Sequence, residues 1–395
     1  MGKPKIRFRG YTEDWEQRKL GDNIVEYTEK TTENNQYPVL TSSRKGIFFQ
    51  TDYYYGNQIA SADNTGYNIV PYGYFTYRHM SDDEIFHFNI NDIAENGIVS
   101  TIYPVFTTDE NLDSRYLQYQ LNYGREFAKY AILQKQGGSR TYMYLNKLRN
   151  LYITVPTTTE EQKKISECFT NLDNLITLHQ RKCEETKKLK KYMLQKMFPR
   201  NGQKVPEIRF SGFTEDWEQR KLGDVFKEYS EKNHTELPAL TIIQGGGTVK
   251  REESDRNLMY DESNLSNYKM VRKGDFIVHL RSFEGGLEKS LLDGIISPAY
   301  HTFHSDVADS RFYYSYFRSH EFIKHKLVPH VYGIRDGRSI DIAGMKTIEI
   351  PYTSMEEQRK IGDYLEVLDN LVTLHQRKCD ELQNIKKYML QNMFV

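Results

Sequence analysis

Residues 6–22 read IRFRGYTEDWEQRKLGD, and the stretch returns at 208–224 as IRFSGFTEDWEQRKLGD with two substitutions. A second matching pair follows, EEQKKISECFTNLDNLITLHQRKCEETKKLKKYMLQKMF at 160–198 and EEQRKIGDYLEVLDNLVTLHQRKCDELQNIKKYMLQNMF at 356–394. Self-similarity at a fixed spacing is the signature of a repeat architecture. The 395-residue chain is therefore predicted to contain two copies of one structural unit.

The sequence between the matched segments has diverged much further, although traces of the repeat remain. GIVSTIYPVF at 97–106 parallels GIISPAYHTF at 294–303, and DSRY at 113–116 parallels DSRF at 309–312. The two matched helical segments are expected to perform the same task twice. The two divergent modules are expected to perform related tasks on different targets. We expect the two variable modules to share one fold and to differ in their surfaces.

The matched segments 160–198 and 356–394 predict long helices. Their seam positions alternate by four and three residues, which is a heptad pattern. In the first helix these positions are Ile165, Phe169, Leu172, Ile176, His179, Cys183, Thr186, Lys190, Met193 and Met197, and the second helix repeats them 196 residues later. Thr159 and Ser354, each followed by first-turn acids, are expected N-caps. Helices of this length span about 60 Å and most simply pack antiparallel, with the modules at opposite ends about a pseudo-twofold axis.

The predicted fold is an α/β (α+β) tandem repeat, with two globular modules separated by two long antiparallel helices that form a coiled coil. The predicted segments are a first module at 1–156, a helix at 157–198, a linker at 199–207, a second module at 208–351 and a helix at 352–395. Short strands are expected at 37–42, 74–80, 97–106, 238–243 and 275–280, with module helices near 114–129 and 310–326.

Composition restricts the class of protein. Lys and Arg number 54, as do Asp and Glu, so the formal net charge is zero. This argues against a generic nucleic-acid coat but leaves locally clustered basic residues possible. The sequence contains no run of about 18 apolar residues, so a membrane span is not expected. The N-terminal residues include no apolar segment, so a signal peptide is not expected. Cys168, Cys183 and Cys379 are scattered singly, as in a cytoplasmic protein with reduced thiols.

Motifs for catalysis or cofactor binding are not recognisable. Residues 245–247 (GGG) lack the spacing of a phosphate loop, and HEFIKH at 320–325 places its histidines five apart instead of four. DDEIFH at 82–87 is similar to a helicase box, but no phosphate loop accompanies it. His and Cys of the LHQRKC segments lie on the helical seam, where polar residues fix register, and we favour that role over metal binding. We expect a non-catalytic chain without a cofactor or metal of its own.

The order of WEQRKLGD, variable module, EEQ and LHQRKC, given twice, resembles the specificity (S) subunit of Type I restriction–modification systems. The resemblance covers nearly the whole chain. It implies that the modules are target recognition domains, each reading half of a bipartite double-stranded DNA site. It also implies that the helices bind two methyltransferase (M) subunits and set the spacer. S-adenosylmethionine would belong to those M subunits, and ATP and Mg to two restriction and translocation (R) subunits.

Candidate DNA-contacting residues are those whose side chains match base edges or phosphates and lie in divergent loops. The loops are 41–46, 77–81 and 134–142 in the first module, and 241–251, 279–286 and 331–339 in the second. The candidates are Ser42, Ser43, Arg44, Lys45, Arg78, Lys135, Gln136, Ser139, Arg140 and Tyr142, and then Gln244, Lys250, Arg251, Arg281, Tyr332, Arg335, Arg338 and Ser339.

Other interpretations of these patterns stay open. The loops can be ordinary solvated loops, and Arg78 and Arg281 can form structural salt bridges. For Lys187, Lys188, Lys190 and Lys191 we favour a solvated helix face over contact with phosphate. At the level of the chain, the alternatives are a scaffold whose modules hold two proteins, and an orphan S-like subunit that serves only recombination of recognition modules.

Overall fold

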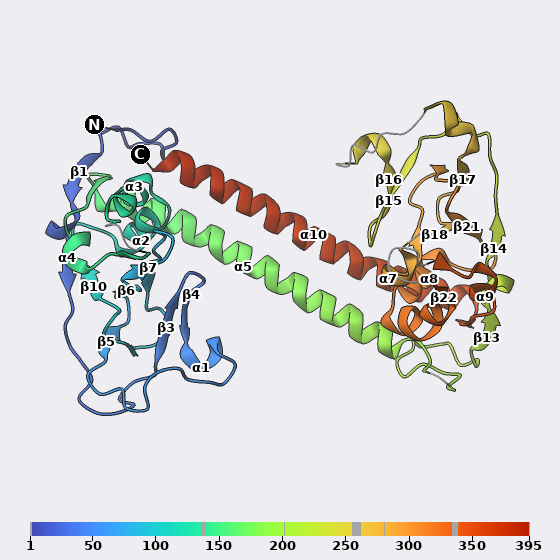
Figure 1. Ribbon diagram of the computed structural model, residues 1–395, viewed down its shortest axis with the longest axis horizontal. Coiled ribbons are helices and arrows are strands. Elements are labelled where there is room, and N and C mark those ends of the chain that lie inside the picture. Colours follow the sequence, from blue (N-terminus) through green and yellow to red (C-terminus); the bar gives the residue numbers. More distant parts are fainter. Residues whose placement is uncertain are drawn as a thin grey trace. The chain divides into compact units, whose positions relative to one another are not determined.

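A computed structural model describes residues 2–135, 139–200, 202–254, 262–279, 281–333 and 339–394. The chain divides into two compact units (Figure 1). Unit 1 consists of Met1–Leu178 together with Lys378–Val395, and unit 2 of His179–Arg377. Each unit therefore combines one variable module with part of each long helix, α5 (Thr159–Lys196) and α10 (Met355–Met393).

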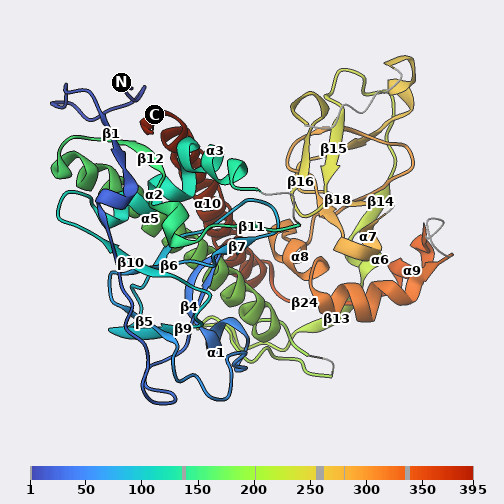
Figure 2. The same cartoon turned by 60° about the vertical axis from the view of Figure 1, so that its left-hand side comes forward.

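Unit 1 is built on an antiparallel sheet in the order β2-β10-β6-β8, with shorter two-stranded ladders around it (Figure 2). Its strands are β1 (Glu16–Lys19), β2 (Ile24–Glu26), β3 (Leu40–Ser43), β4 (Gly46–Phe49), β5 (Asn68–Pro71), β6 (Phe75–Thr76), β7 (Met80–Ser81), β8 (Asn89–Ile90), β9 (Asn96–Val99), β10 (Val105–Thr108), β11 (Thr141–Tyr142) and β12 (Tyr152–Val155). Its helices are η1 (Leu20–Asp22), α1 (Gln50–Tyr53), α2 (Ser114–Tyr123), α3 (Arg125–Leu133) and α4 (Leu145–Leu148).

Unit 2 repeats this plan with the sheet β14-β21-β18-β19, which confirms the same mixed α/β fold in both modules. Its strands are β13 (Glu218–Lys221), β14 (Lys227–Tyr229), β15 (Leu240–Ile243), β16 (Gly247–Lys250), β17 (Lys269–Val271), β18 (Phe276–Val278), β19 (Glu288–Lys289), β20 (Gly294–Ile296), β21 (His301–His304), β22 (Val331–Tyr332), β23 (Ser339–Ile340) and β24 (Glu349–Tyr352). Its helical segments are α6 (Leu222–Val225), η2 (Arg251–Glu253), η3 (Glu262–Asn267), α7 (Ser282–Gly285), α8 (Ser310–Phe317), η4 (Glu321–Leu327), η5 (Val328–His330) and α9 (Ile342–Lys346).

The segments that match between the two copies form a buried clamp in each unit. In unit 1, Arg7 donates from Nε and Nη2 to the Glu161 carboxylate at 2.6 and 2.8 Å, and Trp15 Nε1 donates to it at 3.4 Å. In unit 2, Arg209 and Trp217 hold Glu357 in the same way. Because Glu161 and Glu357 are buried, each needs these donors. The clamp explains why the first matched segment of each copy has kept its sequence together with the second.

The glutamine after each clamp glutamate fixes the module to its helix. Gln162 Oε1 accepts from the backbone N–H of Asp113 at 2.8 Å, and Gln358 Oε1 accepts from that of Asp309 at 2.9 Å. Those aspartates cap α2 and α8 through their own carboxylates. The EEQ motif therefore joins the start of a long helix to the DSR motif of the same unit.

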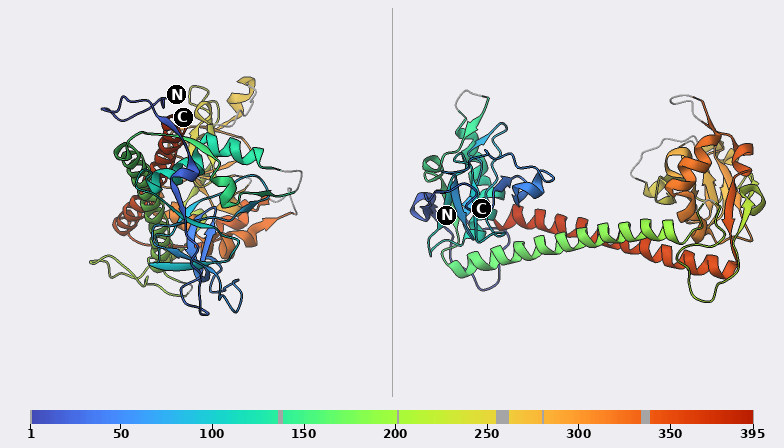
Figure 3. Two further views of the ribbon diagram at one scale, coloured as in Figure 1. Left: turned by 90° about the vertical axis from the view of Figure 1, so that its left-hand side faces the viewer. Right: turned by 90° about the horizontal axis from the view of Figure 1, so that it is seen from below.

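The two long helices lie side by side and antiparallel within each unit, as the heptad pattern predicts (Figure 3). In unit 1, Lys386 Nζ lies 2.5 Å from Asp173, and in unit 2, Lys190 Nζ lies 2.6 Å from the equivalent Asp369. Lys190 is thus engaged on the seam and is no solvated side chain. The backbone N–H of residue 161 bonds the hydroxyl of Thr158, so the first N-cap is one residue earlier than expected.

Four expected elements are divided in the structure. The strand expected at 74–80 becomes β6 and β7, and the helix expected near 310–326 becomes α8 and η4. The strand expected at 97–106 is split into β9 and β10 by a turn. The helix expected near 114–129 breaks at Gly124, whose ψ of 143° is extended and separates α2 from α3. A Cβ at that glycine would lie 2.3 Å from the carbonyl oxygen of Gln120, so the break requires glycine.

Candidate nucleic-acid interface

The turn between β3 and β4 of unit 1 separates its candidates into buried and exposed side chains. Ser42 is buried, and its hydroxyl donates to the Thr76 carbonyl at 3.0 Å and accepts from the Asn89 amide at 2.8 Å. We therefore correct the expectation for Ser42, which supports the core instead of facing a ligand. The Ser43 hydroxyl closes the turn by bonding the carbonyl of Gly46, while Arg44 and Lys45 are exposed.

Three exposed candidates of unit 1 gather around one acidic segment, Asp82, Asp83 and Glu84. Arg44 forms a two-pronged ion pair with Asp83, of which one N–O distance is 2.8 Å. Arg140 Nε lies 2.8 Å from Asp82, and Lys135 Nζ pairs with Glu84. The structure thus brings together loops that no sequence pattern predicted to be neighbours. We call Asp82, Asp83 and Glu84 the acidic segment.

Beside this cluster, unit 1 presents an aromatic ridge made of His79, Tyr142 and Tyr144. Tyr142 and Tyr144 stack with centroids 5.8 Å apart, and Tyr144 stacks on His79 at 4.8 Å. Tyr144 and His79 are absent from the sequence-based candidates. The alternation TYMYL was the available signal, because successive side chains of an extended segment face opposite sides and Met143 between the two tyrosines is fully buried.

The remaining candidates of unit 1 that the structure describes are at the surface. Arg78 and Lys45 are exposed, and within the described residues neither side chain forms a hydrogen bond or ion pair; the backbone N–H of Lys45 bonds the Ser43 hydroxyl. Ser139 is exposed directly before Arg140. Gln136 lies outside the described residues. Arg78 and Lys45 therefore have charges available to a ligand.

In unit 2 the glycine turn between β15 and β16 is occupied by the protein itself. The fully buried Glu288 accepts from the backbone N–H groups of Gly245 at 2.7 Å and Gly247 at 3.2 Å. Tyr314 donates its hydroxyl to the same carboxylate at 2.9 Å, and Arg318 donates to the Gly245 carbonyl at 3.2 Å. These amides are the groups that would cradle a phosphate, so the turn is structural, as its spacing indicated.

Two candidates of unit 2 from different loops lie beside the short helix α7. Gln244 is exposed and packs over Gly285, where a Cβ would lie 2.4 Å from Gln244 Nε2. Gly285 ends α7, and the exposed Arg281 precedes the first residue of the same helix. The arrangement parallels unit 1, where Arg44 of the first hairpin meets the acidic segment. In unit 2 the contact is between the uncharged side-chain amide of Gln244 and Gly285, whereas in unit 1 it is an ion pair.

The other candidates of unit 2 have varied surroundings. Lys250 is 3.5 Å from Glu253, and the Arg251 guanidinium lies 5.6 Å from the centre of the Tyr268 ring. Tyr332 is exposed on β22, which pairs with β23 at Ser339. Arg335 and Arg338 lie outside the described residues.

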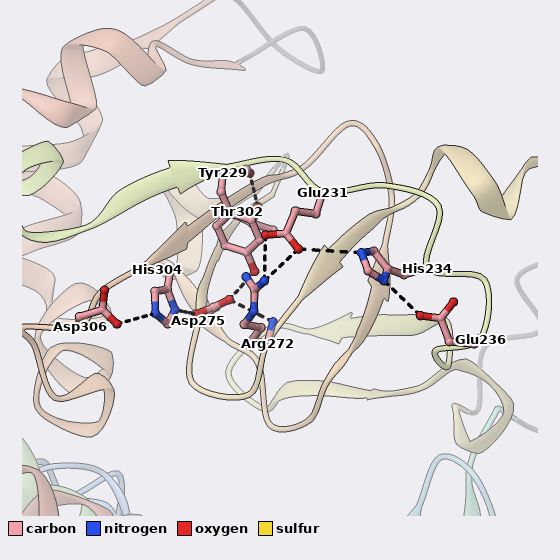
Figure 4. Close-up of polar contacts among 9 residues, drawn as sticks. All are labelled: Tyr229, Glu231, His234, Glu236, Arg272, Asp275, Thr302, His304 and Asp306. Atoms are coloured by element: carbon pink, nitrogen blue, oxygen red, sulfur yellow. Dashed lines mark hydrogen bonds and ion pairs between the residues drawn. The ribbon is translucent and has the colours of Figure 1, made fainter.

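A separate polar network crosses the sheet of unit 2 (Figure 4). The buried Asp275 accepts from the Tyr229 hydroxyl and lies 2.5 Å from His304 Nδ1, and Arg272 pairs with Glu231 at 2.8 Å. The hydrogen bond that His304 donates to the Asp275 carboxylate raises the pKa of His304, and burial raises the pKa of Tyr229. Each buried group in the network has a partner, which identifies it as a structural element of the sheet.

Unit 1 also contains a pocket of about 480 Å³ between its module and its helices. Ile176, Leu390 and Phe394 supply apolar walls, and Arg125 and Lys387 are exposed at its lining. Within the described ranges no group of three or more His, Cys, Asp or Glu side chains is placed to hold a metal ion. No described helix is long and apolar enough to cross a membrane.

Comparison with known proteins assigns this architecture to a family. The sequence pattern of the Type I restriction modification DNA specificity domain matches twice, over residues 12–188 and 214–384. The Type I restriction enzyme MjaVIII specificity subunit of Methanocaldococcus jannaschii is 26% identical over 318 residues, covering 75% of this chain and 73% of that protein. The putative MjaX specificity subunit of the same organism is 23% identical over 406 residues, covering 96% and 92%.

A solved structure shows the same fold. The crystal structure of the S subunit of a Type I restriction-modification system from M. genitalium superimposes with a TM-score of 0.60 at 13% identity, covering 100% of this chain and 99% of that one. The double match to the specificity domain covers most of both repeats. The chain therefore belongs to the family of Type I restriction–modification specificity subunits, the proteins that recognise DNA sequence in these systems.

Proposed function

We propose that each unit reads one half of an asymmetric, bipartite site in double-stranded DNA. The observation that carries this proposal is one scaffold built twice with two different surfaces. Unit 1 presents Arg44, Arg140 and the aromatic ridge, whereas unit 2 presents Gln244 and Arg281 at comparable loops. In the major groove Arg281 suits guanine and Gln244 suits adenine, whereas Arg44 and Arg140 of unit 1 suit phosphates. Different side chains at equivalent loops support two different half-sites.

We further propose that α5 and α10 dock two methyltransferase subunits and set the unread spacer. Ion pairs between the two helices, such as Lys190 with Asp369, fix the register of α5 against α10. A fixed register is needed if the helices set a constant spacer between the half-sites. The pocket of unit 1 offers an apolar docking point beside Arg125 and Lys387. In this proposal the chain has no catalytic role. The methyltransferase subunits bind S-adenosylmethionine and methylate adenine N6, and the restriction subunits bind ATP and Mg.

The test is to co-express the full chain with the methyltransferase subunit of its own system and to map N6-methyladenine across a host genome. We expect a two-part motif with a fixed gap and different halves, lost when this chain is omitted. A continuous motif would contradict the proposal. The absence of any motif would also contradict it, provided that the same methyltransferase is active when paired with another specificity subunit. Binding of two proteins without DNA would instead favour a protein scaffold.

A further inference from the structure

The acidic segment of unit 1 pairs with three basic side chains that come from two other loops of the chain, 41–46 and 134–142. Arg44 is 39 residues before Asp83, Lys135 is 51 residues after Glu84, and Arg140 is 58 residues after Asp82. Each acid thus has one cation of its own. All three cations belong to loops whose residue types are suited to binding DNA phosphates.

These pairs contribute little to the stability of the fold. The side chains of Arg44, Lys135 and Arg140 are 56%, 48% and 50% exposed. Exposed ion pairs gain modest Coulomb energy and lose side-chain entropy, so many contribute nothing measurable to folding. A role other than holding unit 1 together is therefore needed to account for three of them on one surface.

The backbone of the acidic segment is held in place independently of the cations. The Ser81 hydroxyl donates to Asp83 Oδ1 and to the Ile85 carbonyl, both at 2.8 Å. Glu84 adopts a left-handed conformation with φ of 61°, which tightens the turn. The acids are thus fixed, whereas the long Arg and Lys side chains can leave them by rotation.

A carboxylate and a phosphate offer the same two-oxygen face to a guanidinium group. We propose that Asp82, Asp83 and Glu84 occupy the phosphate positions of Arg44, Lys135 and Arg140 in the free protein, and that DNA phosphates replace them on binding. This inference rests on the proposed reading of DNA by unit 1. Every phosphate contact then breaks an internal ion pair and leaves an acid near the DNA, so binding without base contacts is weakened.

The proposal accounts for a DNA-reading chain with no net charge. The chain has 54 basic and 54 acidic residues. On this surface of unit 1 each of the three cations is neutralised by one acid of the acidic segment. The corresponding segment of unit 2, residues 282–285 (SFEG), has a single acid, and its neighbour Gln244 has no charge. We therefore expect the effect at the half-site of unit 1.

The test compares the variant D82N/D83N/E84Q with wild type in the full chain, assembled with its methyltransferase subunits. The probe is a fluorescent 30-base-pair duplex of random sequence, titrated across a salt series. Because the random duplex offers no base contacts, it leaves the three internal pairs of wild type closed. The variant then gains three phosphate contacts, and each adds about −0.9 to the slope of log K against log salt, so its slope is steeper by about 2 to 3. We expect at least a tenfold gain in affinity at low salt, and single variants should each add about one third of the slope change.

The matched control is E33Q/D52N/E110Q, which removes three exposed acids of unit 1 outside the acidic segment. It changes the net charge equally, so it reports the long-range effect alone. Unchanged thermal unfolding shows that each variant is folded. Asn at 83 can still accept from Ser81.

Two results would overturn the inference. If the triple variant and the control raise affinity equally with no change in slope, the acidic segment acts only through net charge. If the triple variant binds more weakly, the acids position the cations in the complex instead of competing with DNA. Failure of the proposed function is distinguishable, because wild type itself would then show no preference for its methylated motif over the random duplex.

Discussion

Burial decides what a single ion pair contributes in this protein. The side chain of Arg209 is 10% exposed and that of its partner Glu357 is 0% exposed. Removing one member of such a pair leaves a buried charge without compensation. The pair of Arg44 with Asp83 has the same chemistry but is about half exposed.

We therefore expect Arg209→Met to lower the free energy of unfolding by roughly 3 to 5 kcal/mol. Arg44→Met should cost about 1 kcal/mol or less. Urea unfolding followed by circular dichroism measures both. An equal loss of unfolding free energy in the two variants would show that the buried clamp does not contribute more to stability than the exposed pair.

His304 gives unit 2 a pH dependence that can be assigned to one residue. Its hydrogen bond with Asp275 raises its pKa above 6.5. Because the folded-state pKa lies above the unfolded one, this stabilisation is complete below about pH 6.5 and is lost as the pH rises through the raised pKa. In NMR titrations His304 should remain protonated beyond pH 6.5. His304→Gln should destabilise the protein more at pH 6 than at pH 8.5, and an equal effect at both would disprove the assignment.

At the scale of elements, the long helices carry a histidine pair on their seam. His179 and His375 lie with their Nδ1 atoms 3.0 Å apart. Partial burial, followed by the charges of His179 and Lys182, lowers the pKa of His375. A lowered folded-state pKa means that stability is complete above about pH 6.5 and falls as the pH drops toward the lowered value.

Mild acid should therefore weaken the pairing of α5 with α10. We expect the melting temperature to fall between pH 7 and pH 5, and the fall to be smaller in His375→Gln. Circular dichroism at 222 nm across that range is the measurement. A fall of the same size in the variant would assign the acid sensitivity to other groups.

The elements differ in how far the sequence predicted them. Heptad spacing predicted α5 and α10 nearly to the residue, because one face of a long helix leaves a periodic record. The break at Gly124 was missed because glycine is tolerated within helices, and only its contact with the Gln120 carbonyl requires it. The partner of Arg140 was also missed, since it depends on pairing between β7 and β11. That of Arg44 was missed because Asn89 holds the β3–β4 turn from a distant segment. No local pattern encodes either contact.

At the scale of the whole molecule, two units with separate reading surfaces should fail separately. Arg140 lies in unit 1, beside the aromatic ridge. We expect Arg140→Ala to weaken binding at the half-site of unit 1 and to reduce the salt slope by about 1, the effect of one lost phosphate contact. The other half of the methylation motif should stay readable, and mapping N6-methyladenine in cells measures both halves. Equal loss in the two halves would mean that Arg140 supports the structure as a whole.

One backbone contact occurs in both units with different connectivity. In unit 2 the N–H of Ile208 donates to the carbonyl of Lys196 at 2.9 Å, across the short linker that joins the two residues. In unit 1 the N–H of Ile6 donates to the carbonyl of Asn392 at the same distance, although these residues are far apart in sequence. The same backbone contact is therefore made once between neighbouring segments and once between segments that are distant in sequence. The contact itself does not need a covalent linker between its two segments.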